Sequence, residues 1–258
     1  MPKLIVHAGF HKTGTTSVQK MLRKNRKTLR PYANIILRPG MLPLCEAARA
    51  WSINRQEWDL GLFKYEAAML AEKFDPNETI ILSSEDLSGH MPGRQGLRRY
   101  DATPRLMSAI DLAFREAQPK ADISYLFFTR AAEPWLASCH VQHVKAARMT
   151  LSRKDYLRKF RKSADLDAVI DQVAEQLDPS RVHRHALEAC AGQLGPLAPV
   201  LKLADVPDTI HAKLKIVSPA DTAPPQSTIQ RLLDLNRSNM SDEEVKDAKP
   251  AILKATDL

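Results

Sequence analysis

Short runs of apolar residues alternate along the chain with longer segments in which apolar residues recur every three or four positions. A short continuous run is typical of a strand buried on both faces of a parallel sheet, and the longer spacing is typical of a helix with one buried face. We therefore predict strands at Leu4–Val6, Asn34–Leu37, Thr79–Leu82 and Ile123–Thr129, with weaker candidates at Arg181–His185 and Lys213–Val217.

The helical spacing covers Ser17–Leu29, Leu42–Phe74, Thr103–Ala117, Arg153–Phe160, Asp165–Leu177 and Thr228–Asn236. A further helix is expected after the fourth strand, with Glu133 at its N-cap and Pro134 as its first residue, because proline is pre-set for that position. Ser241 and Glu244 form a capping-box pattern that predicts a terminal helix. The stretch 192–207 is rich in Pro, Leu and Ala and is expected to form loops and turns.

Strands that alternate with helices imply an α/β fold, and we expect three layers with a mainly parallel sheet of about five strands flanked by helices. At 258 residues the chain suits a single domain over 1–258, with a helical C-terminal portion from about residue 150, where the pattern weakens. In the helical segment 42–74, the residues expected to pack in the core are Trp51, Trp58, Leu62, Tyr65, Met69 and Leu70.

A glycine-containing loop joins the first strand to the first helix. Gly9 and Gly14 have the four-residue separation of a nucleotide-binding P-loop, and Thr16 occupies its final Ser/Thr position. The lysine position, however, holds Thr15, and Lys12 lies three residues earlier, inside the loop. Strand, glycine loop and helix together direct backbone N–H groups and the positive end of a helix dipole toward an anion. A glycine- and threonine-rich turn without a ligand is the alternative interpretation.

The sequence Lys12-Thr13-Gly14-Thr15-Thr16 resembles the 5′-phosphosulfate loop of sulfotransferases, which has the form K-[ST]-G-T-[TS]. The resemblance implies a P-loop NTPase-like fold and a co-substrate, 3′-phosphoadenosine 5′-phosphosulfate (PAPS). It also implies that two threonine hydroxyls hold one phosphate while Lys12 neutralises a second anionic group beside it.

Arg130 ends the most apolar strand, and Ser138 follows eight residues later in the predicted helix. A guanidinium fork and a hydroxyl near a helix start suit one phosphate. The segment YLFFTRAAEPWLASCHVQHVK resembles the 3′-phosphate-binding segment of sulfotransferases, although Arg130-Ala131-Ala132-Glu133-Pro134 departs from the usual Arg-Asp-Pro-like sequence. Two separate phosphate sites suit PAPS. The alternative for Arg130 is a surface ion pair.

The segment Ser83-Ser84-Glu85 follows the third strand, where parallel sheets place their ligands. Because bacterial sulfotransferases often carry a similar Ser-Glu segment there, the resemblance implies that Glu85 removes the acceptor's proton; a structural cap or hydrogen-bond anchor is the equal alternative. The weaker candidates for this base are His11, His90 and His140. Asp86 is the one candidate for a Walker-B carboxylate, but no apolar strand ends in a clear one, and no metal is expected.

The formal net charge of +8 and the pI of about 9.4 favour an anionic partner without choosing among nucleotide, acidic glycan and nucleic acid. The three cysteines are widely spaced, which argues against a disulfide framework or zinc site and favours a reducing compartment. The absence of a signal peptide and of an 18-residue apolar run predicts a cytoplasmic protein without a membrane span.

Three functions fit these observations. The first, implied by the resemblance, is a PAPS-dependent sulfotransferase that acts on a hydroxyl or amine of an unidentified acceptor, of which a carbohydrate is one class; nucleic acid is not expected. The second is a P-loop kinase of a small metabolite, which the missing lysine at position 15 disfavours. The third is a catalytically inactive nucleotide-fold protein that binds acidic partners.

Overall fold

The computed structural model describes residues 3–217 and 223–254, and the chain divides into two compact units. The first unit consists of Met1–Arg130 and Asp165–Ala220, and the second of Ala131–Ala164 and Asp221–Leu258. The prediction of a single domain stays a prediction. Within the described ranges, no helix combines the length and apolar composition that crossing a bilayer requires.

The first unit contains a sheet whose described strands are all parallel and follow the order β2-β3-β1-β4-β5. Their bounds are Lys3–His7 (β1), Asn34–Leu37 (β2), Ile80–Ser83 (β3), Asp122–Thr129 (β4) and Val182–Ala186 (β5). Parallel strands need crossover connections, and the intervening helices supply them. The predicted α/β class with a parallel sheet of about five strands flanked by helices is confirmed.

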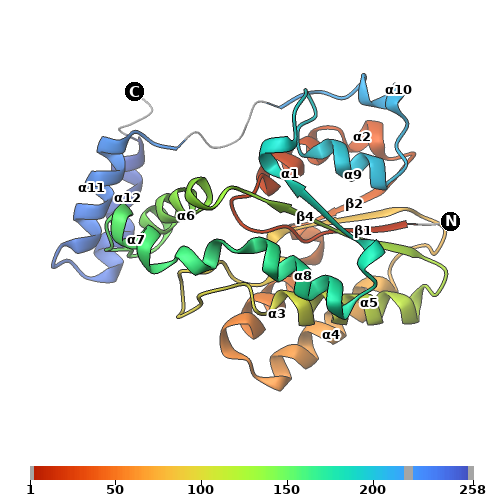
Figure 1. Cartoon of the computed structure of the whole chain (residues 1–258), viewed down its shortest axis with the longest axis horizontal. Coiled ribbons are helices and arrows are strands. Elements are labelled where there is room, and N and C mark those ends of the chain that lie inside the picture. The colour runs from red at the N-terminus through yellow and green to blue at the C-terminus, as the bar shows by residue number, and fades with distance from the viewer. Residues whose placement is uncertain (1–2, 218–222, 255–258) are drawn as a thin grey trace. The chain divides into compact units, whose positions relative to one another are not determined.

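The helices of the first unit cover both faces of this sheet. They are α1 (Thr15–Lys24), α2 (Arg26–Leu29), α3 (Leu42–Asn54), α4 (Glu57–Ala71), α5 (Thr103–Ala117), α8 (Leu166–Gln176), α9 (Leu197–Leu203) and α10 (Asp208–His211). Short 3₁₀ helices lie at Arg38–Met41, Glu85–Ser88, Pro179–Arg181 and Leu187–Ala189. Figure 1 shows α1, α2 and α9 on one face of the sheet and α3, α4, α5 and α8 on the other.

One core lies between the sheet and the α1–α9 face. Ile5 and Ile81 pair in register on neighbouring strands and are fully buried. Val18 and Leu22 from α1 and Leu201 from α9 pack in the same cluster. Because successive strand residues point to opposite faces, the equally buried neighbours of Ile5 face the other helical layer, which explains the continuous apolar run of β1.

Two predictions for the first unit are wrong in the segment after β5. The stretch 192–207 contains helix α9, because Pro196 is its N-cap and Pro199 lies in its first turn, where a missing N–H is tolerated. Residues 213–217 form no strand. The buried side chain of Asn25 instead hydrogen-bonds both the N–H and the carbonyl of Lys215, at 2.7 and 3.0 Å. Asn25 also separates α1 from α2 within the single helix predicted at 17–29.

The predicted helix 42–74 is two helices, and only part of its predicted core is buried. Trp51 and Leu70 are buried as expected. Trp58, Leu62 and Tyr65 are exposed by 68%, 45% and 59%. The buried face of α4 is formed instead by Asp59, Leu60, Phe63, Ala67, Leu70 and Ala71. The segment has the predicted helical period, but Trp58, Leu62 and Tyr65 lie on its exposed face.

The second unit is helical throughout its described elements, which are α6 (Ala132–Ala146), α7 (Arg153–Lys159), a 3₁₀ turn at Arg161–Ala164, α11 (Gln226–Arg237) and α12 (Asp242–Lys254). Val144 of α6 packs against Leu232 and Leu233 of α11 in a small apolar cluster. The predicted capping box is present, with reciprocal backbone-to-side-chain hydrogen bonds of 2.7 and 3.2 Å between Ser241 and Glu244.

Candidate functional site

The carboxyl ends of three neighbouring strands meet at one edge of the sheet, because β3, β1 and β4 are adjacent and parallel. The loop 8–14 follows β1, Ser84 follows β3 and Arg130 follows β4. Ligands of open α/β sheets bind outside this edge. The first unit thus places three of the predicted site segments at the position where a ligand is expected.

The loop between β1 and α1 holds its shape by backbone torsion and internal hydrogen bonds. Its φ angles are positive at Gly9, Lys12 and Gly14, at 53°, 67° and 93°. The hydroxyls of Thr13 and Thr15 both donate to the carbonyl of Phe10, at 2.7 and 3.2 Å. A left-handed conformation at lysine is uncommon, so the surrounding contacts must hold it in place.

The backbone conformation at the start of α1 favours glycine at position 14, and a nearby side chain adds to that preference. The φ of Gly14, 93°, disfavours any residue with a Cβ, and an added Cβ would lie 2.7 Å from Leu187 Cδ1. Gly14 is the N-cap of α1, with its carbonyl accepting from the N–H groups of Ser17 and Val18. The first turn has no side-chain cap and no acidic residue. The positive end of this ten-residue helix is therefore suited to an anion.

The threonines of the loop differ in what their hydroxyls can do. Thr13 and Thr15 are buried, and each hydroxyl proton is already donated to Phe10. Thr16 is exposed. A phosphate accepts hydrogen bonds, so Thr15 must redirect its proton from Phe10 to serve as the ligand that the sequence predicts. The role of these threonines in phosphate binding stays a prediction.

Arg130 reaches the loop from the end of β4. Its Nη1 donates to the backbone carbonyl of Lys12 at 3.2 Å, and its side chain is half-buried. This contact joins two of the predicted site residues within the first unit. It also brings a permanent positive charge to a loop whose P-loop lysine position holds Thr15.

Glu85 lies beside the first helix. Ser84 N-caps the 3₁₀ helix that follows β3, accepting from the N–H of Asp86, and Glu85 is its first residue. The Oε2 atom of Glu85 accepts a hydrogen bond of 2.8 Å from Gln19 Nε2, which belongs to the second turn of α1. Among the described residues, no hydrogen bond to Oε1 is present, so one carboxylate oxygen of Glu85 is available to a ligand.

A cluster of partly buried charged side chains surrounds the buried Asp86. Arg38 donates to Asp86 at 2.6 Å, Arg49 lies 4.0 Å away, and His11 Nε2 lies 3.4 Å from its other oxygen. His11 Nδ1 in turn contacts the hydroxyl of Tyr100 at 3.0 Å, and the two rings stack. Burial of the carboxyl opposes ionisation, but the hydrogen bonds and charges of His11 and Arg38 prevail and lower the pKa of Asp86 to about 2. Asp86 is therefore a fixed anion that orients His11.

Sequence reasoning missed this cluster. From the sequence alone, His11 is only a weak candidate for the base and Asp86 only an unclear candidate for a Walker-B carboxylate. Arg38 directly follows β2, so it ends at the same sheet edge, and this position was the available signal. Tyr100 lies in an irregular segment before α5, and no pattern in the sequence connects it to His11.

His7 lies beneath the loop as the last residue of β1. It is fully buried, and its Nδ1 atom is 2.8 Å from Ser83 Oγ on the neighbouring strand. An added Cβ on Gly9 would lie 3.3 Å from His7 Nε2, and this nitrogen has no hydrogen-bond partner in the described part of the chain. Burial lowers the pKa of His7 to about 4, so the ring under the loop is neutral at pH 7.

The remaining predicted site residues are Ser138, His90 and His140. Ser138 is half-buried in α6 of the second unit, and its joint role with Arg130 stays a prediction. The predicted start of that helix is wrong by two residues, because its N-cap is Ala131 and Pro134 lies inside the first turn.

His90 and His140 contact backbone carbonyls through their rings, and burial lowers the pKa of both. In residues 3–217 and 223–254, no group of three or more His, Cys, Asp and Glu side chains is arranged to hold a metal ion.

No family model matches the sequence, and no curated protein matches it. A solved sulfotransferase from Alicyclobacillus acidocaldarius is 14% identical with a TM-score of 0.48, over 99% of this chain and 95% of that one. A retinol dehydratase solved with androsterone and the inactive cofactor PAP is 14% identical with a TM-score of 0.36, over 98% and 80%. A structure from the PezAT toxin–antitoxin system of Streptococcus pneumoniae is 9% identical with a TM-score of 0.34, over 96% and 87%. At these values no activity or substrate follows for this chain.

Proposed function

We propose that this chain is a sulfotransferase that moves a sulfuryl group from PAPS to a hydroxyl or amine of an acceptor. The observation that carries the proposal is the hydrogen bond from Arg130 Nη1 to the backbone carbonyl of Lys12. It lies beside the start of α1, which has no side-chain cap. Two cationic side chains and a helix N-terminus at one sheet edge form a site for a strongly anionic ligand. The positive φ angles of Gly9 and Gly14 give the loop the turn that leads from β1 into α1.

In this proposal the loop 12–16 holds the 5′-phosphosulfate end of the nucleotide. Lys12, Thr13, Gly14, Thr15 and Thr16 are its binding residues. Arg130 and Ser138 hold the 3′-phosphate, as the resemblance of their segment implies. The hydrogen bond from Arg130 Nη1 to Lys12 leaves the other guanidinium nitrogens of Arg130 to donate to a phosphate.

The reaction forms one bond and breaks another at sulfur. The acceptor oxygen or nitrogen attacks the sulfur atom, and the bond from sulfur to the bridging oxygen of the 5′-phosphate breaks. The electron pair of that bond remains on the phosphate oxygen, where Lys12 neutralises the developing charge. The products are the sulfated acceptor and adenosine 3′,5′-bisphosphate (PAP).

Glu85 receives the proton that the acceptor loses. Its Oε2 is held by Gln19, which orients the carboxylate, and among the described residues no hydrogen bond occupies its Oε1, which can therefore accept the proton. His11 is the second candidate for this base, because Asp86 and Tyr100 orient its ring. Both nitrogens of His11 are already in contact with those residues, which favours Glu85.

A thermal-shift comparison of three ligands tests the proposal against its two alternatives. PAP at about 100 times its dissociation constant should stabilise the protein by about 2.7 kcal/mol. Stabilisation by ATP with Mg²⁺ and not by PAP would favour the kinase, and stabilisation by single-stranded nucleic acid alone would favour an inactive protein that binds acidic partners. A screen of glycan, phenol, lipid and peptide acceptors with labelled PAPS then identifies the acceptor class.

A further inference from the structure

The positive charge of the chain is concentrated at its beginning. The first acidic residue is Glu46, and nine of the 38 Lys and Arg residues precede it. The remaining 29 are balanced by 30 Asp and Glu, so the first 45 residues carry the whole excess charge. Six of the nine lie on α1, on α2 or directly after α2, and all six are exposed: Lys20, Arg23, Lys24, Arg26, Lys27 and Arg30.

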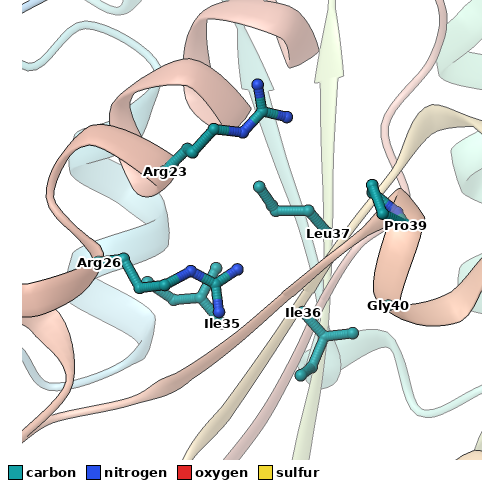
Figure 2. Close-up of a pocket in the computed structure, with 7 residues that line it drawn as sticks. All are labelled: Arg23, Arg26, Ile35, Ile36, Leu37, Pro39 and Gly40. Atoms are coloured by element: carbon teal, nitrogen blue, oxygen red, sulfur yellow. The ribbon is translucent and has the colours of Figure 1, made fainter.

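A pocket of about 170 Å³ lies between this basic surface and strand β2. It is lined by Arg23, Arg26, Ile35, Ile36, Leu37, Pro39 and Gly40. Figure 2 shows both arginine side chains extending from the α1–α2 segment toward the strand. The pocket therefore has a cationic side and an apolar side.

The two arginines have not been neutralised by the fold. Among the residues that the structure describes, neither Arg23 nor Arg26 forms an ion pair, although Arg38 beside the same strand pairs with Asp86 and Glu46. An exposed guanidinium fork that lacks a carboxylate partner is suited to bind one from another molecule.

The pocket follows the free edge of the sheet. Among the described strands β2 is the outermost on its side, paired with β3 only. Successive strand residues point to opposite faces, so a pocket lined by Ile35, Ile36 and Leu37 in succession touches both faces of β2, which fits a position along its outer edge. An occupant of this pocket thus lies beside a strand whose outward N–H and C=O groups pair with no other described strand.

We propose that the edge of β2 binds an extended acidic segment of a partner protein, which pairs with the strand and places a carboxylate between Arg23 and Arg26. Strand addition to a sheet edge is a known mode of peptide recognition. The pocket is smaller than the roughly 300 Å³ at which small-molecule sites begin, and it suits single side chains of a segment lying across it. The unpaired backbone favours a peptide over a nucleic acid or a glycan, because only a peptide offers matching N–H and C=O groups at strand spacing.

The test uses the full chain and a fluorescein-labelled heptapeptide of alternating glutamate and valine, with binding measured by anisotropy at low and physiological salt. The double variant Arg23→Gln/Arg26→Gln should weaken binding about tenfold or more, because charge-assisted hydrogen bonds are lost. The matched control Lys20→Gln/Lys24→Gln removes the same charge from the same helical segment outside the pocket lining and should change affinity less than about threefold. A peptide with alternate backbone N-methyl groups, which cannot pair with a strand, should not bind measurably.

Four results would overturn this inference. Two of them concern the peptides: the glutamate peptide does not bind, or the N-methylated peptide binds equally well. The third is an equal loss of affinity in the two double variants. The fourth is that a sulfated hexasaccharide or an oligothymidylate binds more tightly than the glutamate peptide and that Arg23→Gln/Arg26→Gln abolishes this binding. None of them bears on PAP binding at the loop 12–16, so the two proposals fail separately.

Discussion

Arg130 Nη1 donates a hydrogen bond to the backbone carbonyl of Lys12 across 3.2 Å, although 118 residues separate the two in the chain. The end of β4 is thereby tied to the loop that follows β1. Lys12 has a φ of 67°, a conformation that non-glycine residues seldom adopt, and the hydrogen bond helps to keep it there. The same arginine brings positive charge to a loop with threonine at the usual lysine position.

Replacing Gly14 by alanine should destabilise the protein more than the same replacement at Gly192, a glycine with nearly the same φ angle. Gly14 and Gly192 have φ angles of 93° and 92°, but only at Gly14 would an added Cβ meet a side chain, 2.7 Å from Leu187. Gly192→Ala should lower the free energy of unfolding by about 1 kcal/mol, the effect of the φ angle alone. Gly14→Ala should lower it further and weaken PAP binding. Chemical denaturation and calorimetry give both values, and equal losses in the two variants would rule out the contact with Leu187.

Glu85→Gln should abolish turnover and leave PAP binding intact. The amide keeps an oxygen that can accept from Gln19, so the local structure is preserved while the proton acceptor is removed. With the best acceptor from the screen, we expect the rate to fall about 100-fold or more. Glu116→Gln, an exposed residue on α5, is the control. A Glu85→Gln enzyme of unchanged turnover would transfer the role of base to another residue, with His11 the next to be tested.

The charge cluster around Asp86 should stabilise the fold at neutral pH and lose this effect in acid. The pKa of Asp86 is lowered from 3.8 to about 2. A carboxyl with a depressed pKa contributes stability above its unfolded pKa, and that contribution, about 2 kcal/mol, disappears as the pH falls from about 4 to about 2. The difference in unfolding free energy between wild type and Asp86→Asn should therefore shrink over this window. A difference that is constant with pH would contradict the assignment.

His7 should produce a second dependence on pH, at higher values. Burial lowers its pKa from 6.5 to about 4, so the unfolded chain binds a proton in this window that the folded chain does not. Stability should fall by up to about 3 kcal/mol as the pH drops from 6.5 to 4. His90 and His140 act in the same direction, so the comparison of wild type with His7→Gln isolates the share of His7. If His7→Gln takes up as many protons on unfolding as the wild type does, His7 does not titrate in this way.

Much of the fold follows from the sequence, because continuous apolar runs define buried parallel strands. The predicted strand Asn34–Leu37 and helix Thr103–Ala117 have the bounds found in the structure. The errors share a physical origin, since tertiary contacts override local pattern. The backbone of Lys215 bonds the side chain of Asn25 instead of a strand, and Trp58 lies on the exposed face of α4.

The candidate site was predictable where it coincides with strand ends. Lys12, Glu85 and Arg130 each follow a strand closely, and their strands prove to be neighbours in the sheet. The contact of His11 with Tyr100 was not predictable, because it joins a loop to an irregular segment 89 residues away. The joint role of Arg130 and Ser138 rests on an eight-residue spacing and needs experiment.

The central claim is that one doubly phosphorylated adenosine binds with its 5′ end at the loop 12–16 and its 3′-phosphate at Arg130, and titration calorimetry tests it directly. PAP should bind the wild-type chain at least about tenfold more tightly than adenosine 5′-phosphate, which lacks the 3′-phosphate. Arg130→Ala should remove most of that preference, while Arg105→Ala, an exposed arginine on α5, should keep it. Equal affinity for the two nucleotides in the wild type, or no binding of PAP, would contradict the account.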